Sequence, residues 1–348
     1  LITQLFGDRM YISNATGCSS IWGNSSPSTP YTANKAGKGP AWSNSLFEDN
    51  AEFGYGMLLA QQAIRDGLKA KVEEVAANEN ATAEVKTACQ EWLDTFSVGA
   101  TNGVATDKLV AVLENVDCPT CKDIVKNKDF LAKKSQWIFG GDGWAYDIGF
   151  NGVDHVLASG KDINIMVFNT EVYSNTGGQS SKATPTGAVA QFAAGGKEVK
   201  QKDLAAIAMS YGYVYVAQIS MGADMNQTIK AIAEAEAYPG PSLIIAYAPC
   251  INHGIKKGMS KAQTEEELAV KCGYWHNFRF NPEAESKFTL DSKAPTEDYQ
   301  AFLDGEVRYN SLKRSNPEKA ARLFAKNEAE AKARFEYLQK LIALHSAE

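Results

Sequence analysis

Two polar clusters that could hold a metal ion and a phosphate follow neighbouring apolar runs of the sequence. The letters GGDG (140–143) end the first run, and the letters NTE (169–171) end the second. Glycine lets the backbone approach a phosphate closely, but the Asp142 carboxylate repels that phosphate unless a cation lies between them. Mg²⁺ is the usual cation where one or two carboxylates meet phosphate oxygens. The pattern predicts a Mg²⁺-diphosphate site with ligands from Asp142 and Thr170.

The same residues lie on a predicted strand–helix–strand unit. Residues 136–139 and 163–168 have the apolar character of buried strands, and an amphipathic stretch lies between them. In open α/β sheets, ligands bind beyond the carboxyl ends of the strands, where helix N-termini also present free N–H groups to anions. Asp142 and Thr170 are therefore expected at the same edge of a parallel sheet.

The rest of the chain continues this alternation of helices and strands. Residues 10–14 form a short predicted strand near the start. Further on, residues 201–211 and 224–237 are predicted helices, and residues 213–219 and 242–247 are predicted strands. This order predicts the α/β fold class, with a mostly parallel sheet flanked by helices and right-handed crossovers.

Segments of different composition interrupt or follow this pattern. Residues 23–45 are rich in Gly, Ser, Pro and Asn, which predicts a long irregular loop. Residues 45–130 have helical periodicity and are interpreted as a mainly helical insertion. We predict one α/β domain over residues 1–310, which includes the insertion, and a C-terminal helical tail over residues 311–348.

Composition and charge exclude several classes of protein. The 348 residues have a formal net charge of −6, whereas nucleic-acid binding requires a basic stripe. No N-terminal segment combines a basic start with an apolar core, so we expect no secretion signal in these residues. The charge-free run at 204–223 contains polar residues and is predicted to divide into a helix end and a strand. We expect neither nucleic acid nor membrane as a partner. The start at Leu1 suggests the interior of a longer polypeptide.

Two longer strings resemble a known family. GDGWAYDIG (141–149) and NTEVYSNTGGQSSKATPTGA (169–188) are similar to the thiamine diphosphate (TPP)-binding domain of pyruvate:ferredoxin oxidoreductase, the pyruvate synthase family. The resemblance covers roughly residues 1–60 and 130–310. It implies a diphosphate-binding TPP module, in which Mg²⁺ is held by side-chain oxygens of Asp142 and Thr170 and the backbone carbonyl of Val172.

The resemblance also implies which residues surround the cofactor. Asn175 is the candidate catalytic residue, because it matches a position that contacts the reacting groups. The loop at 176–196 is expected to close over the diphosphate and the thiazolium, with Lys182 as a candidate contact. The implied cofactor-binding residues are Cys18, Gly141, Asp142, Gly143, Trp144, Thr170, Glu171, Val172, Tyr173, Ser174 and Asn175.

Two of the six cysteines follow predicted strands at the edge that carries Asp142. From the residues alone, Cys18 and Cys250 could be buried core cysteines in a protein from a reducing compartment. The resemblance implies instead that they are two of the four ligands of a 4Fe-4S cluster near TPP. In the family the other two ligands form a CxxC pair upstream of Leu1, which this sequence lacks.

A CxxC motif, Cys118 to Cys121, lies within the helical insertion. Such a motif can bind zinc or a cluster, or act as a thioredoxin-type redox pair. Zinc or a cluster requires two further ligands nearby, and the thioredoxin motif follows a strand, whereas this motif lies in a charged segment between helices. We interpret it as a loop with incidental cysteines.

By resemblance, the chain is part of an enzyme of anaerobic pyruvate metabolism. The whole enzyme converts pyruvate and CoA to acetyl-CoA and CO₂, and passes electrons through iron-sulfur clusters to ferredoxin or flavodoxin. The expected partners are the pyrimidine-binding and ferredoxin-like cluster domains of the same enzyme, in a homodimer. The cytoplasm, or the lumen of a hydrogenosome-type organelle, is the expected location. Because the glutamate that activates TPP lies in another domain of the family, this chain is expected to be inactive alone.

Three alternatives stay open. The chain could serve a related oxidoreductase with another 2-oxo acid, or with NADP as the electron acceptor. It could belong to a cluster-free TPP carboligase or decarboxylase. A non-catalytic interaction domain that has kept the TPP fold is the third alternative, although the presence of Asp142, Thr170 and Asn175 argues against it.

Overall fold

The computed structural model describes residues 1–17, 19–20 and 31–346. Contacts divide the chain into two compact units. The helical unit comprises Leu1–Tyr11, Tyr31–Ala41 and Phe53–Gln136, and the sheet unit comprises Ile12–Pro30, Trp42–Glu52 and Trp137–Glu348.

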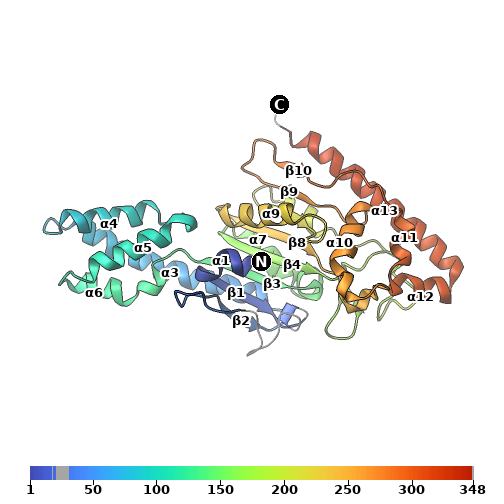
Figure 1. Cartoon of the computed structure of the whole chain (residues 1–348), viewed down its shortest axis with the longest axis horizontal. Coiled ribbons are helices and arrows are strands. Elements are labelled where there is room, and N and C mark those ends of the chain that lie inside the picture. Colours follow the sequence, from blue (N-terminus) through green and yellow to red (C-terminus); the bar gives the residue numbers. More distant parts are fainter. Residues whose placement is uncertain (18, 21–30, 347–348) are drawn as a thin grey trace. The chain divides into compact units, whose positions relative to one another are not determined.

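An eight-stranded sheet has the order β10-β9-β7-β8-β4-β3-β1-β2. Strands β3, β4, β8 and β7 are mutually parallel, and the hairpin β9–β10 runs antiparallel at one edge (Figure 1). The predicted mostly parallel α/β sheet is confirmed. The strands are β1 (Met10–Ala15), β2 (Ala41–Ser45), β3 (Ser135–Gly140), β4 (Ile163–Asn169), β7 (Tyr215–Ile219), β8 (Pro241–Tyr247), β9 (Phe278–Phe280) and β10 (Phe288–Leu290).

Helices that connect the parallel strands pack against the sheet. These are α7 (Phe150–Ala158), α8 (Leu204–Met209) and α9 (Met225–Ala237), which all contact β8. Almost every residue of β4 and β8 is buried, as expected for central parallel strands. The charge-free run at 204–223 forms α8 and β7, and none of the helices in the described ranges has the length and apolar character needed to cross a membrane.

The turn after β3 is a π-helical one. A single π-helical turn, Gly143–Asp147, connects β3 to α7, and such turns occur often at functional sites. A Cβ atom on Gly140 would lie 2.2 Å from Cε3 of Trp144, whose side chain is fully buried. Glycine at this position therefore lets the indole pack directly on the end of β3.

The predicted irregular loop at 23–45 is wrong at its C-terminal end, where residues 41–45 form the edge strand β2. Asn14 Nδ2 donates to Asn44 Oδ1 at 2.8 Å, and Thr16 N donates to Ser45 O at 3.3 Å. Pairing with β1 satisfies backbone N–H and C=O groups of this segment. Its Gly-, Ser-, Pro- and Asn-rich composition suggested instead that these groups would face water. Residues 21–30 of the predicted loop lie outside the described part of the chain.

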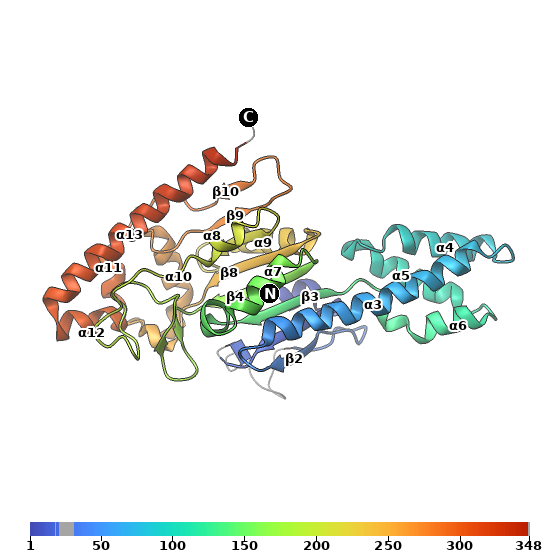
Figure 2. The ribbon, with the colours of Figure 1, turned by 180° about the vertical axis from the view of Figure 1, so that it is seen from behind.

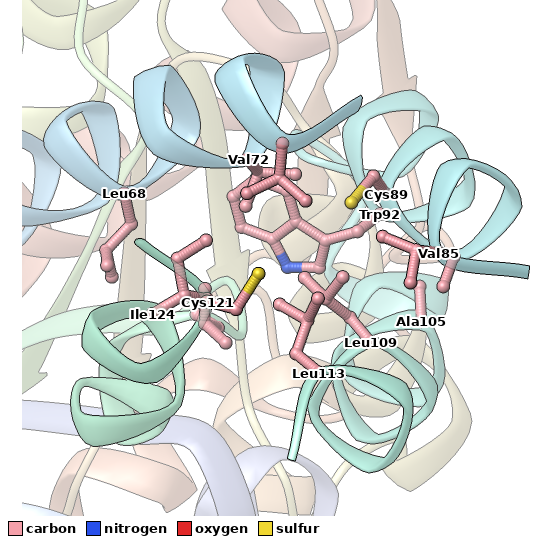
Figure 3. Close-up of a cluster of buried hydrophobic side chains, with 13 residues drawn as sticks. Leu68, Val72, Val85, Cys89, Trp92, Ala105, Leu109, Leu113, Cys121 and Ile124 are labelled. Atoms are coloured by element: carbon pink, nitrogen blue, oxygen red, sulfur yellow. The ribbon is translucent and has the colours of Figure 1, made fainter. Parts of the chain in front are cut away.

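The helical unit has its own hydrophobic core (Figure 3). Trp92, Leu109 and Leu113 meet there, and all three are almost completely buried. The predicted helical character of this region is confirmed. The interpretation of the CxxC segment as a loop is wrong, because this segment begins a helix. The helices are α3 (Asn50–Ala77), α4 (Ala83–Asp94), α5 (Gly99–Leu113) and α6 (Pro119–Lys126).

The C-terminal segment forms helices α11 (Tyr299–Asp304), α12 (Val307–Ser315) and α13 (Pro317–Leu344). Helix α13 packs against β10, α11 and α12 (Figure 2). Asn327 Nδ2 of this helix donates to Thr186 O at 2.6 Å, near the end of the second motif string. The tail thereby stabilises a loop close to the predicted cofactor site.

Replacing Trp92 tests the core of the helical unit. Trp92→Ala removes the largest buried side chain there, and we expect a loss of about 3–5 kcal/mol in the free energy of unfolding. Val104→Ala is the matched control, because Val104 is 76% exposed, and we expect a change within about 0.5 kcal/mol. Urea denaturation followed by far-ultraviolet circular dichroism measures both, and equal midpoints would contradict the assignment of this core.

Candidate cofactor site

A cavity of about 700 Å³ lies in the sheet unit, beyond the carboxyl ends of β1 and β3. Gly141, Asp142, Gly143, Tyr173 and Asn175 line it, as predicted for residues that border the cofactor. The other lining residues are Ala15, Thr16, Gly17, Phe47, Ile148, Thr176, Gln179, Ser180 and Phe192.

The three predicted Mg²⁺ ligands lie close together, and Asp142 among them lines this cavity, whereas Thr170 and Val172 do not. Thr170 N donates to Asp142 Oδ1 at 2.9 Å, and Thr170 Oγ1 donates to the carbonyl of Val172 at 3.0 Å. All three residues are buried. A carboxylate, a hydroxyl and a carbonyl thus meet in one place, and such oxygen groups, completed by water and phosphate oxygens, suit Mg²⁺.

The electrostatics of Asp142 fit a bound cation. Burial raises the pKa of this carboxyl well above its ordinary value, although hydrogen bonds from Ser181 and Thr170 oppose the shift. Ser181 Oγ donates to Asp142 Oδ2 at 3.0 Å, and Asp142 forms no ion pair with any residue of the described ranges. No group of three or more His, Cys, Asp and Glu side chains among the described residues could hold a metal ion, so a site here depends on mixed oxygen ligands.

Gly143 allows two aromatic rings to approach the turn. A Cβ atom at this position would lie 2.1 Å from Cε1 of Tyr173 and 2.4 Å from Cζ of Phe47. These two rings are 6.1 Å apart between centroids and form an apolar wall of the cavity. The glycine of the motif is therefore required by side chains as well as by any phosphate.

Trp144, Ser174 and Lys182 do not line this cavity. Trp144 packs beneath the turn, against Gly140. The carbonyl of Ser174 accepts a hydrogen bond from Asn252 Nδ2 at 3.1 Å, and Lys182 Nζ lies 2.7 Å from Asp147 Oδ1. The placement of these side chains does not support the direct cofactor contacts predicted for them, and those contacts stay predictions.

Glu171 also does not line the cavity. Its side chain is fully buried, and Oε2 lies 2.7 Å from Arg308 Nη2 and accepts a hydrogen bond from Tyr274 at 2.7 Å. Burial alone would raise the pKa of this carboxyl, but Arg308 and the hydrogen bonds hold it below its ordinary value. Arg308 Nε also pairs with Glu306 Oε2 at 2.6 Å.

Glu171, the acidic partner of this buried pair, has an unusual backbone conformation. Glu171 has φ = 61°, in the left-handed region that non-glycine residues seldom adopt. The residue stands between Thr170 and Val172, so its conformation sets the direction of both predicted ligands. Thr184 Oγ1 also donates to the Glu171 carbonyl at 2.5 Å. We infer that the Arg308 ion pair offsets a strain of roughly 1–3 kcal/mol at this turn.

Sequence reasoning missed Ser181 and Arg308. Ser181 lies inside the second motif string, and a hydroxyl near a predicted ligand could have indicated it. Arg308 had no local signal, because its position depends on backbone pairing of distant segments. Val307 N donates to Gly254 O at 2.9 Å, and Val189 N donates to Arg308 O at 3.0 Å.

The structure describes only one of the two predicted cluster ligands. Cys18 lies outside the described residues. Cys250 follows β8 and is partly exposed, and its backbone N donates to His253 Nδ1 at 3.0 Å. Burial opposes the Cys250 thiolate, but His253 and Ser174 stabilise it, so the pKa of Cys250 falls to about 7. The iron-sulfur role of both residues stays a prediction.

Comparison with known proteins supports the family resemblance. Residues 126–246 match the family model "Thiamine pyrophosphate enzyme, C-terminal TPP binding domain". A pyruvate-flavodoxin oxidoreductase of Enterobacter agglomerans is 58% identical over 98% of this chain, and a pyruvate:ferredoxin oxidoreductase of Moorella thermoacetica is 56% identical over 98%. The mitochondrial pyruvate dehydrogenase [NADP(+)] of Euglena gracilis is 47% identical over 98% of this chain.

The chain spans about 30% of the length of the first two relatives and 19% of the third. Both motif strings that carried the resemblance lie within the matched residues 126–246. The resemblance inferred from those strings is therefore confirmed, and residues 126–246 of this mostly parallel α/β fold match a TPP-binding domain.

Replacing Asp142 with Asn tests the buried charge. A pKa raised in the folded state means that the free energy of unfolding falls as the pH rises through that pKa. Without metal, we therefore expect Asp142→Asn to be more stable than the natural protein at pH 8, by roughly 1–3 kcal/mol. The difference should vanish below about pH 4, where the carboxyl is protonated in both states. Urea denaturation in chelator across this pH range is the measurement, and a variant that is less stable throughout would contradict it.

Replacing Arg308 tests the support of the metal-binding turn. Arg308→Met removes the guanidinium that pairs with two buried carboxylates, Glu171 and Glu306, and leaves His253 as the remaining charged partner of Glu171. We expect a loss of about 3–5 kcal/mol in stability together with weaker Mg²⁺ binding in the presence of TPP. Arg279→Met is the matched control, because Arg279 pairs with Glu234 and Asp291 away from the cavity. Both variants should lose stability, but only Arg308→Met should raise the Mg²⁺ dissociation constant measured by calorimetry. Equal dissociation constants in the two variants would exclude this role.

Proposed function

We propose that this chain is the TPP- and Mg²⁺-binding part of an enzyme that oxidatively decarboxylates pyruvate with CoA to acetyl-CoA and CO₂. The observation that carries the proposal is the set of hydrogen bonds that join Asp142, Thr170 and Val172 within the matched TPP-binding region, beside a cavity that Asp142 lines. The names of two relatives, pyruvate-flavodoxin and pyruvate:ferredoxin oxidoreductase, support the substrate and the electron acceptors.

The residues of the site would bind and orient the cofactor. TPP, when bound, supplies the electron sink that decarboxylation of a 2-oxo acid requires. Asp142, Thr170 and Val172 would hold the cation that neutralises its diphosphate. Gly141 and Gly143 line the cavity where the diphosphate would approach the backbone. Their lack of side chains leaves room for its oxygens.

Asn175 is proposed to contact the reacting groups. It lines the same cavity as the Asp142 carboxylate, beyond the turn that carries Thr170 and Val172. An amide there can donate to one oxygen and accept from another group without changing its charge. The Phe47 and Tyr173 rings form an apolar wall of the cavity, which favours the exclusion of water from the chemistry.

The rest of the enzyme would complete the site. Ile148 and Phe192 line the cavity and are 63% and 93% exposed, so apolar surface lies open beside it. Large exposed apolar groups beside a site often mark a contact with another domain or subunit. We propose that the pyrimidine-binding domain covers them and supplies the activating glutamate. The chain alone would then be inactive.

Electron transfer would depend on residues outside this chain as well as on two of its cysteines. Cys18 and Cys250 would supply two of the four ligands of a 4Fe-4S cluster, with the others from outside residues 1–348. The cluster would pass electrons toward ferredoxin or flavodoxin in a homodimer of the full protein. A cytoplasmic location, or the lumen of a hydrogenosome-type organelle, is consistent with this chemistry.

The name of one relative supports a second candidate function. The Euglena gracilis protein named pyruvate dehydrogenase [NADP(+)] matches nearly the whole chain. The same TPP site could therefore serve an enzyme that reduces NADP⁺. Assays of the complete protein with ferredoxin, flavodoxin and NADP⁺ as separate acceptors distinguish the two functions.

Calorimetric titration of the complete protein with TPP and Mg²⁺ tests the site. We expect Asp142→Ala to weaken binding more than about 100-fold, because it removes the one charged ligand. Asp154→Ala is the matched control, since Asp154 accepts a hydrogen bond from Tyr211 and does not line the cavity. Normal binding by Asp142→Ala would overturn the proposed site, and weak binding by the natural protein would overturn the proposed function.

A further inference from the structure

The CxxC motif of the helical unit begins helix α6. Cys118 is the N-cap residue, and its Sγ accepts a hydrogen bond from Cys121 N at 3.4 Å. Pro119 occupies the first helical turn, where its fixed φ favours helix initiation and its missing N–H costs nothing. The motif therefore has an ordered structure, in which the Cys121 backbone N–H donates to the Cys118 sulfur.

The two thiols differ in their surroundings. Cys118 is partly exposed, so a solute can reach it. Cys121 is 1% exposed and belongs to the core cluster that contains Trp92 (Figure 3). Residues three apart on a helix are neighbours on one face. The motif thus places an accessible thiol beside a protected one.

The local donors make the two thiols chemically unequal. The Cys121 backbone N–H and side chain, aided by Thr120, stabilise the Cys118 thiolate and lower the pKa of Cys118. Burial, with a smaller contribution from Cys118, raises the pKa of Cys121 to about 12. The thiolate is the nucleophile in disulfide exchange, so Cys118 is the attacking group and Cys121 keeps its proton.

Metal binding does not account for this arrangement. A structural zinc site takes four ligands, and Fe–S clusters are also commonly held by four. Within the described ranges, no three His, Cys, Asp or Glu side chains form a group that could hold a metal ion. The neighbouring Cys89 is completely buried in the same core (Figure 3).

We propose that Cys118 and Cys121 form a redox-active dithiol that is reversibly oxidised to an intramolecular disulfide by a small-molecule disulfide. The Cys118 thiolate attacks one sulfur of that disulfide, a mixed disulfide forms, and one thiolate leaves. Cys121 then attacks Cys118 Sγ, and the second thiol leaves with the proton of Cys121. Two electrons and one proton pass from the thiolate–thiol pair to the external disulfide, which is reduced to one thiolate and one thiol. This site is independent of the proposed TPP function.

Differential alkylation of the full chain tests the dithiol, with glutathione and glutathione disulfide as the probe. Lys108 and Lys122 flank both cysteines, so one tryptic peptide, 109–122, contains the pair. After oxidation and acid quench, we expect this peptide to lose both alkylatable thiols and to carry no glutathione. Excess reduced glutathione should restore both thiols.

Three variants make the test specific. Cys118→Ser keeps a preferred N-cap residue, so the helix should fold, and the disulfide should be lost completely. Cys121→Ala should trap glutathione on Cys118, because the second attack cannot occur. Cys89→Ala is the matched control for a buried cysteine of the same core, and it should form the disulfide as the natural chain does.

Several results would overturn the proposal. One is a natural peptide that stays fully alkylatable in glutathione disulfide. Another is glutathione that stays on Cys118 of the natural chain, which would mean that Cys121 does not resolve the mixed disulfide. Loss of the disulfide in Cys89→Ala would assign the pairing to Cys89 instead. Circular dichroism of each variant verifies that the helical unit is folded.

Discussion

The candidate cofactor site depends on one buried ion pair, between Glu171 and Arg308. It holds a non-glycine residue at φ = 61°, and this residue stands between the two predicted ligands Thr170 and Val172. The guanidinium comes from the start of helix α12, far along the chain from the motif. A buried ion pair is weak evidence for net stability, but losing one partner is costly, so the pair specifies the geometry of the turn.

The two buried carboxylates at this turn are treated in opposite ways. Glu171 has a cation from the protein, and Arg308 and neighbouring hydrogen bonds hold its pKa down. Asp142 has hydrogen bonds from Thr170 and Ser181 only, and burial holds its pKa up. The first carboxylate serves the fold, whereas the second has no cationic partner from the described residues, and burial disfavours its charged form. That difference is the physical basis for placing Mg²⁺ beside Asp142.

The helical unit shows how local geometry separates two like groups. Cys118 and Cys121 have the same chemistry in the sequence, and helix α6 exposes one thiol and buries the other. The interpretation as a loop failed because the charged residues nearby suggested solvent, whereas the apolar face of α6 packs on Trp92 and Leu113. An amphipathic helix of eight residues provides little periodicity from which to recognise it.

The sequence by itself determined the parallel α/β fold and the proximity of Asp142 to Thr170 beyond the ends of neighbouring strands. Those inferences rest on strand periodicity and on the motif letters around Asp142 and Thr170, which are local properties. Only the tertiary structure decided that Glu171 faces away from the cavity, that Arg308 supports it, and that residues 41–45 pair as a strand. These outcomes depend on contacts between segments far apart in the chain, whose partners no local pattern specifies.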